Sequence, residues 1–322
     1  MTAMKKRASP PTLWLGLQLI LWLSVLACTL ALIGIGSRSP SPAALVEVPF
    51  SGTPKIAFLF LARSNLPLDF LWHAFFQNAE EDKYSIYVHS EPGFVFDRTT
   101  TRSPFFFGRQ IQDSIKVVWG EATMIEAERL LFAAALKDPA NRRFALISDS
   151  CVPLYNFSHI YNYVMSSSKS FVDSFLDKRE RRYNPKMFPT IPKDRWRKGS
   201  QWTILVRKHA QIVVADTVVF PEFRRFCKRR IEPVLGGKQN HKEAAQKEHN
   251  CIPDEHYMQT LLSNINHIYY ETEYRTEWCQ CNVIFVPCFL FARKFSRSAA
   301  MRILKEGLIG PFDAGAVLFT SS

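Results

Sequence analysis

Residues 55–63 read KIAFLFLAR, a continuous apolar run with a basic residue at each end. A short apolar run without polar alternation is typical of a strand buried on both faces, as in a parallel sheet. The sequence predicts three further strands, at YSIYVHS (84–90), IKVVW (115–119) and RRFALISDS (142–150). Helical periodicity occurs between them, at LPLDFLWHAFFQNA (66–79) and ATMIEAERLLFAAALKD (122–138). Strands that alternate with helices predict an α/β fold built on a parallel sheet with right-handed crossovers.

Four short segments follow the predicted strands, at residues 62–64, 89–91, 119–121 and 148–150. In parallel sheets ligands bind beyond the carboxyl ends of the strands, so these segments are the first candidates for a site. The sequence contains neither GxGxxG nor a P-loop, which argues against a standard dinucleotide or NTPase site.

The N-terminal part of the chain predicts a membrane anchor. Residues 13–36 carry no charge and are long enough to cross a membrane, which needs roughly 20 apolar residues. A cleaved signal peptide has an apolar region of only about 7–15 residues, so we expect a retained transmembrane signal-anchor. The preceding basic residues predict that residues 1–12 form a cytosolic tail. Residues 37–54 are rich in Ser and Pro and predict a stem, which leaves residues 55–322 as a luminal domain.

The formal net charge of +12 suggests an anionic partner. We expect no nucleic-acid partner, because the basic residues are scattered and no RRM-, KH- or zinc-finger-like pattern occurs. A nucleotide-sugar diphosphate, an anionic glycan or the membrane surface fits the charge.

A luminal location also agrees with a glycosylation sequon and with the cysteines. Asn156, Phe157 and Ser158 form an acceptor sequon. An oxidising compartment favours disulfide bonds among some of the six cysteines of the body, with buried free thiols as the alternative. These cysteines are Cys151, Cys227, Cys251, Cys279, Cys281 and Cys288.

Residues 251–262 read CIPDEHYMQTLL, and the proline followed by two acidic residues predicts a helix start. Asp254 is the better candidate for the N-cap, because its short side chain can accept from backbone N–H groups two or three residues on. The longer side chain of Glu255 then stays free to reach a substrate. The local pattern alone does not decide whether either carboxylate is catalytic.

Seven segments of this chain occur in a recognisable order. Together they resemble the core-2/I-branching β-1,6-N-acetylglucosaminyltransferases, glycosyltransferase family 14, and especially the plant branch of that family. The likeness covers roughly residues 55–300 and rests on KIAFLFLAR, YSIYVHSEPG, VVWGEATMIEAERLLFAAAL, LISDSCVPLYNFSHIYNY, KGSQWTILVRKHA, PDEHYMQTLL and LFARKFS. The resemblance implies a Golgi type II membrane enzyme with a GT-A-like, Rossmann-type domain. Such an enzyme takes a UDP-sugar donor and a glycan or glycoprotein acceptor, and it transfers with inversion.

The resemblance also implies roles for individual residues. Glu255 matches the family glutamate that acts as catalytic base, and Lys294 matches the family lysine assigned to the donor diphosphate. A family arginine lies upstream of that lysine, and Arg275 is the nearest basic residue in this chain. The sequence contains no Asp-x-Asp, so we expect no divalent metal and no cofactor, with fixed cations meeting the charge of the leaving diphosphate.

Four further residues are carried over from the same resemblance. His89 and Asp149 are predicted near the donor, although His89 stands where the animal enzymes have an aspartate, and a structural histidine is the alternative. Lys198 and Trp202 are predicted on the acceptor side, with a core tryptophan as the alternative. The sequence therefore predicts an inverting, metal-independent UDP-sugar glycosyltransferase. A catalytically silent, membrane-anchored glycan-binding protein on the same fold is the alternative.

Overall fold

In a computed structural model, the described residues are 22–25, 50–177, 182–227, 251–263, 269–271, 279–281, 284–286 and 289–305. The chain divides into two units, Met1–Val48 and Pro49–Ser322. In the first unit residues 22–25 are helical, and most of the predicted tail, anchor and stem lies outside the described residues. Among the helices that are described, none combines the length and the apolar character that a membrane crossing requires.

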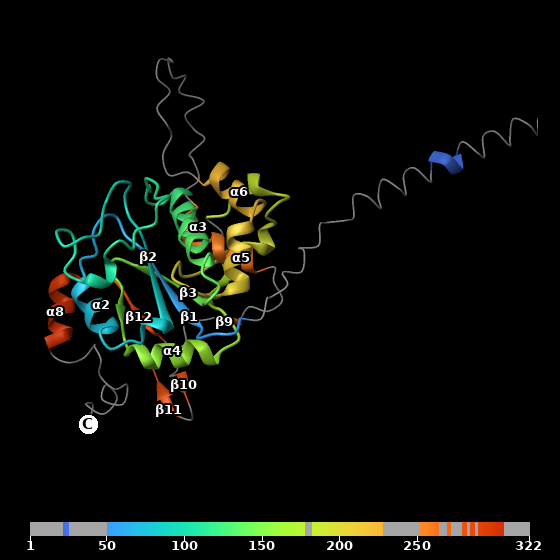
Figure 1. Cartoon of the computed structure of the whole chain (residues 1–322). Helices are drawn as coiled ribbons and strands as arrows, with labels where there is room; N and C mark the ends of the chain where they lie inside the picture. Colours follow the sequence, from blue (N-terminus) through green and yellow to red (C-terminus); the bar gives the residue numbers. More distant parts are fainter. Residues whose placement is uncertain are drawn as a thin grey trace, which may run out of the picture. The chain divides into compact units, whose positions relative to one another are not determined.

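A six-stranded sheet forms the centre of the second unit, in the order β2-β1-β3-β8-β5-β9 (Figure 1). Its strands are β1 (Lys55–Leu61), β2 (Tyr84–His89), β3 (Asn141–Ser148), β5 (Phe171–Asp173), β8 (Ile204–Val206) and β9 (Tyr269–Glu271). β1 is parallel to both β2 and β3, whereas β8 runs antiparallel to β3 and to β5. The predicted α/β fold with a parallel core is therefore confirmed, and β8 adds an antiparallel element to it.

The apolar run of β1 is continuous because both of its faces are buried. Ala57 and Leu59 contact one hydrophobic cluster, and Phe58 and Phe60 contact the other. Each of these four side chains is fully buried. Since successive side chains of a strand point to opposite faces, a strand between two apolar layers requires apolar residues at every position.

Helices cover both faces of the sheet. One layer contains α2 (Asp69–Phe76), α4 (Phe157–Ser166) and α8 (Arg297–Lys305), and it shares the cluster around Phe58 (Figure 1). The other layer contains α3 (Thr123–Leu136), α5 (Arg207–Ala215), α6 (Val219–Phe226) and α7 (Tyr257–Leu262). The predicted helices 66–79 and 122–138 correspond to α2 and α3, which are shorter than predicted at both ends.

The predicted strand at 115–119 is wrong, because residues 115–118 have no regular secondary structure. The outer edge of β2 is instead occupied by residues 109–111: the N–H of Val88 donates to the carbonyl of Arg109, and the N–H of Ile111 donates to that of Val88. Ile115 donates its N–H to Nε2 of His89 at 3.1 Å. Ile115 and Val117 of this segment therefore pack against the core without joining the sheet, and Val118 and Trp119 are exposed.

Several short elements complete the second unit. Two-stranded pairs join β4 (Val152–Pro153) to β12 (Phe291–Ala292), β6 (Phe175–Leu176) to β7 (Arg197–Lys198), and β10 (Cys279–Cys281) to β11 (Ile284–Val286). Single 3₁₀ turns occur at Glu81–Lys83, Pro104–Phe106, Pro185–Met187, Lys193–Arg195 and Pro253–Glu255. The pairs β4–β12 and β6–β7 matter most, because they bring distant segments to the same end of the sheet.

Candidate functional site

The carboxyl ends of β2, β1 and β3 lie level with one another, since Leu61 is in register with both His89 and Ser148. The β4–β12 pair adds a distant segment to this edge. Ala292 is paired with Val152, and the N–H of Phe295 donates to the carbonyl of Ser150 at 3.1 Å. Arg293 and Lys294 are thus held between two points of attachment to the segment that follows β3. The structure therefore places Lys294 beside the edge that carries Asp149.

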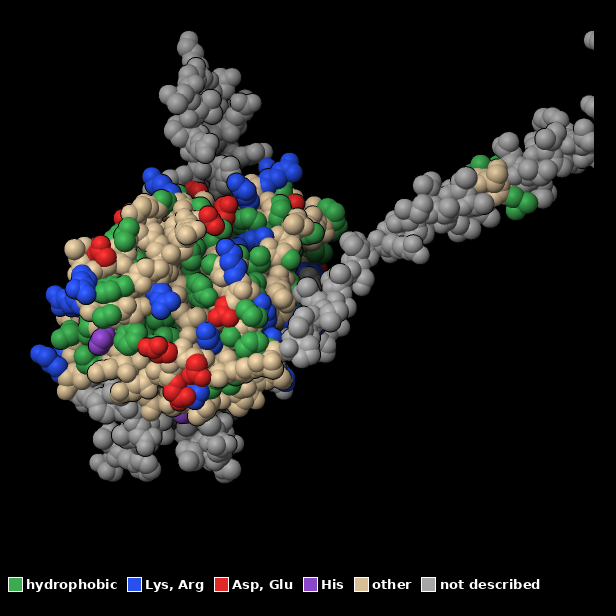
Figure 2. All heavy atoms as spheres, viewed as in Figure 1, with side chains coloured by type: hydrophobic (Ala, Val, Ile, Leu, Met, Phe, Trp, Pro, Cys, Tyr) green, Lys and Arg blue, Asp and Glu red, His purple; other side chains and the backbone are tan. Residues whose placement is uncertain are grey.

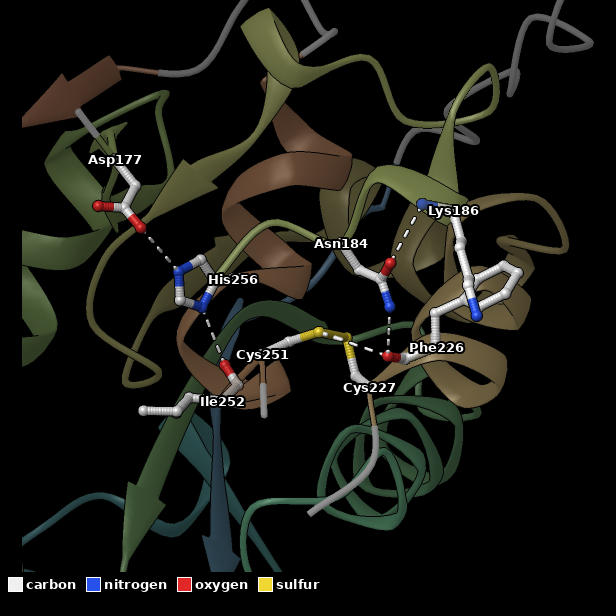
Figure 3. The surroundings of a disulfide bond; sticks show 8 residues. All are labelled: Asp177, Asn184, Lys186, Phe226, Cys227, Cys251, Ile252 and His256. Carbon is white, nitrogen blue, oxygen red and sulfur yellow. Dashed lines mark hydrogen bonds and ion pairs between the residues drawn. A yellow bond between two sulfur atoms is a disulfide. The ribbon is translucent and has the colours of Figure 1, made fainter. Parts of the chain in front are cut away.

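The acidic turn Pro253–Glu255 is fixed by its N-terminal flank. A disulfide bond joins Cys227 to Cys251, both buried, directly before the turn (Figure 3). Ile252 has a left-handed backbone with φ of 49°, and the chain then enters the 3₁₀ turn. A β-branched residue rarely adopts positive φ, so the surrounding packing must hold this conformation. The turn therefore presents Asp254 and Glu255 in a defined orientation.

His256 lies on the buried side of the acidic turn. Its Nδ1 lies 3.0 Å from the carbonyl oxygen of Ile252, and Nε2 lies 3.8 Å from Oδ2 of Asp177 (Figure 3). The ring stacks on Trp196 with centroids 4.6 Å apart. Burial lowers the pKa of His256 to about 4, which the hydrogen bond to Ile252 and the charge of Asp177 oppose. His256 is therefore neutral near pH 7 and supports the turn.

The prediction that Asp254 caps the helix is wrong. The carboxyl group of Asp254 makes no capping hydrogen bond to α7, because the residue lies inside the 3₁₀ turn and His256 occupies the N-cap position. The side chain is 8% exposed, and Oδ1 has no hydrogen-bond partner in the described part of the chain. Burial raises the pKa of Asp254 to about 6, against the backbone hydrogen bond and the charge of Arg293.

Glu255 is half-exposed, unlike the buried Asp254. Its Oε2 lies 3.5 Å from Nζ of Lys198, on β7. The N–H of Gly199 donates to the backbone carbonyl of Glu255 at 2.9 Å. The structure therefore brings the predicted base and the predicted acceptor-side lysine together, although the two residues are far apart in the sequence.

The segment 198–202 is held tightly against the acidic turn and α7. Nε2 of Gln259 donates to the carbonyl of Ser200 at 2.5 Å, and the N–H of Arg197 donates to Oγ1 of Thr260 at 3.1 Å. A Cβ atom on Gly199 would lie 1.8 Å from the carbonyl oxygen of Asp173, so only glycine fits there. The close approach of three backbones explains why Lys198 reaches Glu255.

Glu128 is a buried residue near the site that was not among the residues predicted from the sequence. It belongs to α3, is 2% exposed and accepts from Nε2 of Gln201 at 2.6 Å. Burial raises the pKa of Glu128 well above its usual value, and the charge of Asp254 adds to this. Glu128 could have been found from the sequence as an acidic residue on the apolar face of a predicted helix, since such residues are seldom buried without a partner.

Trp202 supports a cation at the same edge. The guanidinium of Arg293 lies over the Trp202 ring, 4.6 Å from its centroid. Arg293 also interacts electrostatically with the carboxyl groups of Asp149 and Asp254. One face of the tryptophan predicted on the acceptor side is thus covered by an arginine.

The two residues predicted near the donor have different surroundings. Burial raises the pKa of the half-buried Asp149, against the charges of Arg63 and Arg293. His89 is 1% exposed, and burial lowers its pKa to about 4. Since Nε2 of His89 accepts the N–H of Ile115, the ring ties the irregular segment 115–118 to β2. These contacts support the structural alternative for His89.

A buried ionic network holds α7 against the helical layer. Arg129 donates to the hydroxyl of Tyr257 at 2.7 Å, and that hydroxyl donates to Oδ2 of Asp216 at 2.9 Å. Asp216 in turn caps α6, because its carboxylate accepts the N–H groups of residues 218–220. The network fixes the helix that follows the acidic turn.

Other predicted residues lie away from these contacts. Arg275 and Cys288 lie outside the described residues. Asn156 is the N-cap of α4, where its side chain accepts the N–H of His159 at 2.8 Å. Cys151 is a buried free thiol, so both predicted states of the cysteines occur. Within the described ranges there is no cluster of three His, Cys, Asp or Glu that could hold a metal ion.

The fold and the site define an α/β protein whose basic and acidic side chains meet at the carboxyl edge of a parallel sheet. Comparison with known proteins specifies the family. The family model for the Core-2/I-Branching enzyme matches residues 56–282. The chain is also 48% identical over 318 residues to the protein named Glycosyltransferase BC10 from Oryza sativa subsp. japonica, covering 83% of this chain and 80% of the relative. The chain therefore belongs to the Core-2/I-branching family and is a glycosyltransferase homologue, as the sequence predicted.

Proposed function

We propose that this protein transfers a sugar from a UDP-sugar to a hydroxyl group of a glycan or glycoprotein, with inversion and without a divalent metal. The sugar is N-acetylglucosamine or a related sugar. We propose a GT-A-like domain that a single N-terminal helix anchors in the Golgi membrane, facing the lumen. Family membership supports the transferase class, and the charge-free segment 13–36 supports the anchor.

The observation that supports the mechanism is the accessibility of Glu255 beside Asp254, a carboxyl group on which a cation after β12 acts. Glu255 is half-exposed and paired with Lys198, so its carboxylate is accessible and oriented. Asp254, its neighbour, lies within the electrostatic reach of Arg293, which directly precedes Lys294. An inverting transfer requires a base on the acceptor side and positive charge on the leaving-group side. In this proposal Glu255 is the base and Lys294 supplies the positive charge.

In this proposal Glu255 accepts the proton of the attacking hydroxyl as the bond from that oxygen to the sugar anomeric carbon forms. The bond from that carbon to the UDP oxygen breaks at the same time. Lys294 meets the charge that develops on the diphosphate. Two unit charges about 4 Å apart interact by roughly 4 kcal/mol at an effective dielectric near 20, so fixed cations can stabilise the leaving group. Arg275 is the further cation proposed from the sequence.

The test compares Glu255→Gln with the wild-type luminal domain across a panel of UDP-sugars and glycan acceptors. We expect wild-type transfer with at least one donor, and a loss of about 10²–10⁴-fold in kcat/KM for the variant. Glu81→Gln is the matched control, because Glu81 is an exposed glutamate on the turn before β2. If wild-type and Glu255→Gln proteins transfer equally, Glu255 is not the base. A wild-type protein that binds glycans but neither binds nor turns over any UDP-sugar would establish the silent glycan-binding alternative.

A further inference from the structure

Glu128 is an acidic residue inside the apolar stripe of α3. Its neighbours one turn away, Ile125, Leu131 and Phe132, are fully buried, and Glu128 itself is 2% exposed. Other Asp and Glu side chains of the second unit are visible at its surface, where water solvates them (Figure 2). An apolar side chain at position 128 would suit the packing, whereas a carboxyl group loses its hydration there. Residues that break the local pattern are expected mainly at functional or strained sites, so the carboxyl group requires a reason beyond packing.

The carboxyl group of Glu128 meets the side chain of Gln201, on the segment that precedes β8. Nε2 of Gln201 donates to Oε1 of Glu128 at 2.6 Å, and Gln201 is 8% exposed. Burial raises the pKa of Glu128 well above its usual value, which favours the protonated carboxyl group. A protonated carboxyl group still accepts a hydrogen bond through its carbonyl oxygen. Without this bond Gln201 would bury an unpaired donor, so the bond ties the segment 198–202 to α3.

The same segment contacts the proposed base. The N–H of Gly199 donates to the backbone carbonyl of Glu255 at 2.9 Å, and Nζ of Lys198 lies 3.5 Å from Oε2 of Glu255. The N–H of Ser200 donates to Oδ2 of Asp173 at 3.0 Å, which fixes the middle of the segment to β5. The segment therefore connects the interior of α3 to both the backbone and the side chain of the proposed base.

The acidic turn also packs against α3 directly. The charge of Asp254, the residue before Glu255, acts on the carboxyl group of Glu128 and helps to raise its pKa. Glu128 thus lies behind the acidic turn, on the side away from solvent, while Glu255 is half-exposed. A change at Glu128 can reach Glu255 through the segment without any contact between Glu128 and a substrate.

We infer that Glu128 is a positioning residue for the transfer reaction, because its hydrogen bond to Gln201 holds the segment 198–202 where Lys198 and Gly199 orient Glu255. This inference rests on the proposed function, in which Glu255 is the base, and it adds a residue of α3 to the reaction. A base displaced by about 1 Å can lose about 10²-fold in rate, so a buried bond that fixes its supports affects catalysis.

Two substitutions of Glu128 separate the hydrogen bond from other effects of the side chain. Glu128→Gln keeps the size and an acceptor oxygen for Gln201, so kcat should stay within about twofold of wild type. Glu128→Leu keeps a similar volume but removes the acceptor, so kcat should fall about tenfold while the KM for the donor changes less than about twofold. Glu126→Leu is the matched control, since it makes the same change at a partly exposed position of the same helix. An equal loss of kcat in Glu128→Gln and Glu128→Leu overturns the inference.

A double variant separates positioning from stability. Glu128→Leu leaves the donors of Gln201 buried and unpaired, so it also lowers the free energy of unfolding. Glu128→Leu/Gln201→Leu removes both partners and should regain most of the lost stability. It should not regain kcat, because the bond that holds the segment is still absent. If kcat returns together with stability, the role of Glu128 is only structural and the inference is wrong.

Hydrogen exchange, measured by mass spectrometry on the peptide that contains residues 198–202, reports on the segment without the reaction. Glu128→Leu should speed the exchange of the N–H groups of Gly199 and Ser200, and Glu128→Gln should not. Faster exchange with unchanged kcat overturns the positioning role, as does unchanged exchange in Glu128→Leu, and either result leaves the proposed function intact. A wild-type protein that transfers no sugar overturns the proposed function instead, and the exchange still decides whether Glu128 holds the segment.

Discussion

Nζ of Lys198 lies 3.5 Å from Oε2 of Glu255, and both side chains are more than one-third exposed. An ion pair this accessible contributes little to stability, typically less than about 1 kcal/mol. The ion pair instead orients Glu255, because the lysine restricts the rotamers of this proposed base. The N–H of Gly199 also donates to the backbone carbonyl of the same glutamate.

Lys198→Gln should therefore separate activity from stability. We expect kcat/KM to fall about tenfold through lost orientation of Glu255. The free energy of unfolding should stay within about 1 kcal/mol of wild type. Lys83→Gln is the control, since Lys83 forms a comparable surface pair with Glu80 at 2.7 Å. Steady-state kinetics and urea denaturation measure the two quantities, and equal kinetics for both variants would contradict the orienting role.

Gly199→Ala should lower both stability and activity. The added Cβ would overlap the backbone carbonyl of Asp173, and a backbone atom cannot move aside as a flexible side chain can. We expect a loss of roughly 1–3 kcal/mol, the usual cost of overpacking, together with displacement of Glu255. Gly93→Ala is the control, because its φ of 84° is unfavourable for alanine but its Cβ meets nothing within 4 Å. The control should lose stability without losing transfer.

The buried groups around the acidic turn predict opposing pH effects on stability. The pKa of His256 falls from 6.5 to about 4, so the unfolded state binds a proton that the folded state does not between these values. The free energy of unfolding therefore decreases as pH drops through that window, by up to about 1.4 kcal/mol per pH unit. The pKa of Asp254 rises from 3.8 to about 6, so its favourable contribution exists at low pH and is lost as pH rises through about 6.

Asp254→Asn isolates the second effect. The variant should be more stable than wild type at pH 7.5, by about 1–3 kcal/mol, because it no longer buries a charge with an unpaired oxygen. Its stability should also fall more steeply between pH 6 and pH 4, since the opposing contribution of Asp254 is gone. Urea titrations at pH 4.5, 6.0 and 7.5 check both statements. A variant that is less stable than wild type at pH 7.5 would contradict this account of Asp254.

The disulfide between Cys227 and Cys251 should support both the fold and the acidic turn. It spans a sequence separation of 24 residues, for which loop entropy predicts about 3.5 kcal/mol. The double variant Cys227→Ser/Cys251→Ser should lose about that much stability, and its transfer rate should fall because the turn loses its N-terminal tether. Dithiothreitol should lower the Tm of the wild type but leave the Tm of the double variant unchanged. If dithiothreitol lowered the Tm of both proteins equally, the stabilisation would not come from this disulfide.

The sequon at Asn156 allows capping and glycosylation to be separated. Oδ1 of Asn156 accepts the N–H of His159, and a glycan would attach to the other side-chain atom, Nδ2. Asn156→Gln should lose the glycan and about 0.5–2 kcal/mol of stability. Ser158→Ala, at an exposed position, should lose only the glycan. Mass spectrometry of secretory-pathway material measures the glycan, and an unglycosylated Asn156 there would argue against the luminal topology.

The positions of β1, β2 and β3 could be predicted from the sequence because each contains apolar residues that the sheet buries, in a continuous run in β1 and in β3 and at alternate positions in β2. The segment 115–119 shows the limit of that signal. Ile115 and Val117 pack against the core, whereas Val118 and Trp119 are exposed, and residues 109–111 already occupy the outer edge of β2. Edge occupancy depends on which segments compete for the same backbone donors and acceptors, and composition does not record that competition.

The acidic turn could be predicted as a helix start, and Glu255 as the accessible member of the pair. The role of Asp254 could not be predicted. The disulfide and the left-handed Ile252 precede a 3₁₀ turn that contains Asp254, and α7 begins only after that turn. The pairing of Glu255 with Lys198 and the contact of Arg293 with Trp202 also depend on tertiary structure. By itself the sequence determined the family, the parallel core and the candidate base, since these follow from local residue order. Only the folded chain decided which charges meet, because β6–β7 and β4–β12 bring together segments that no sequence spacing relates.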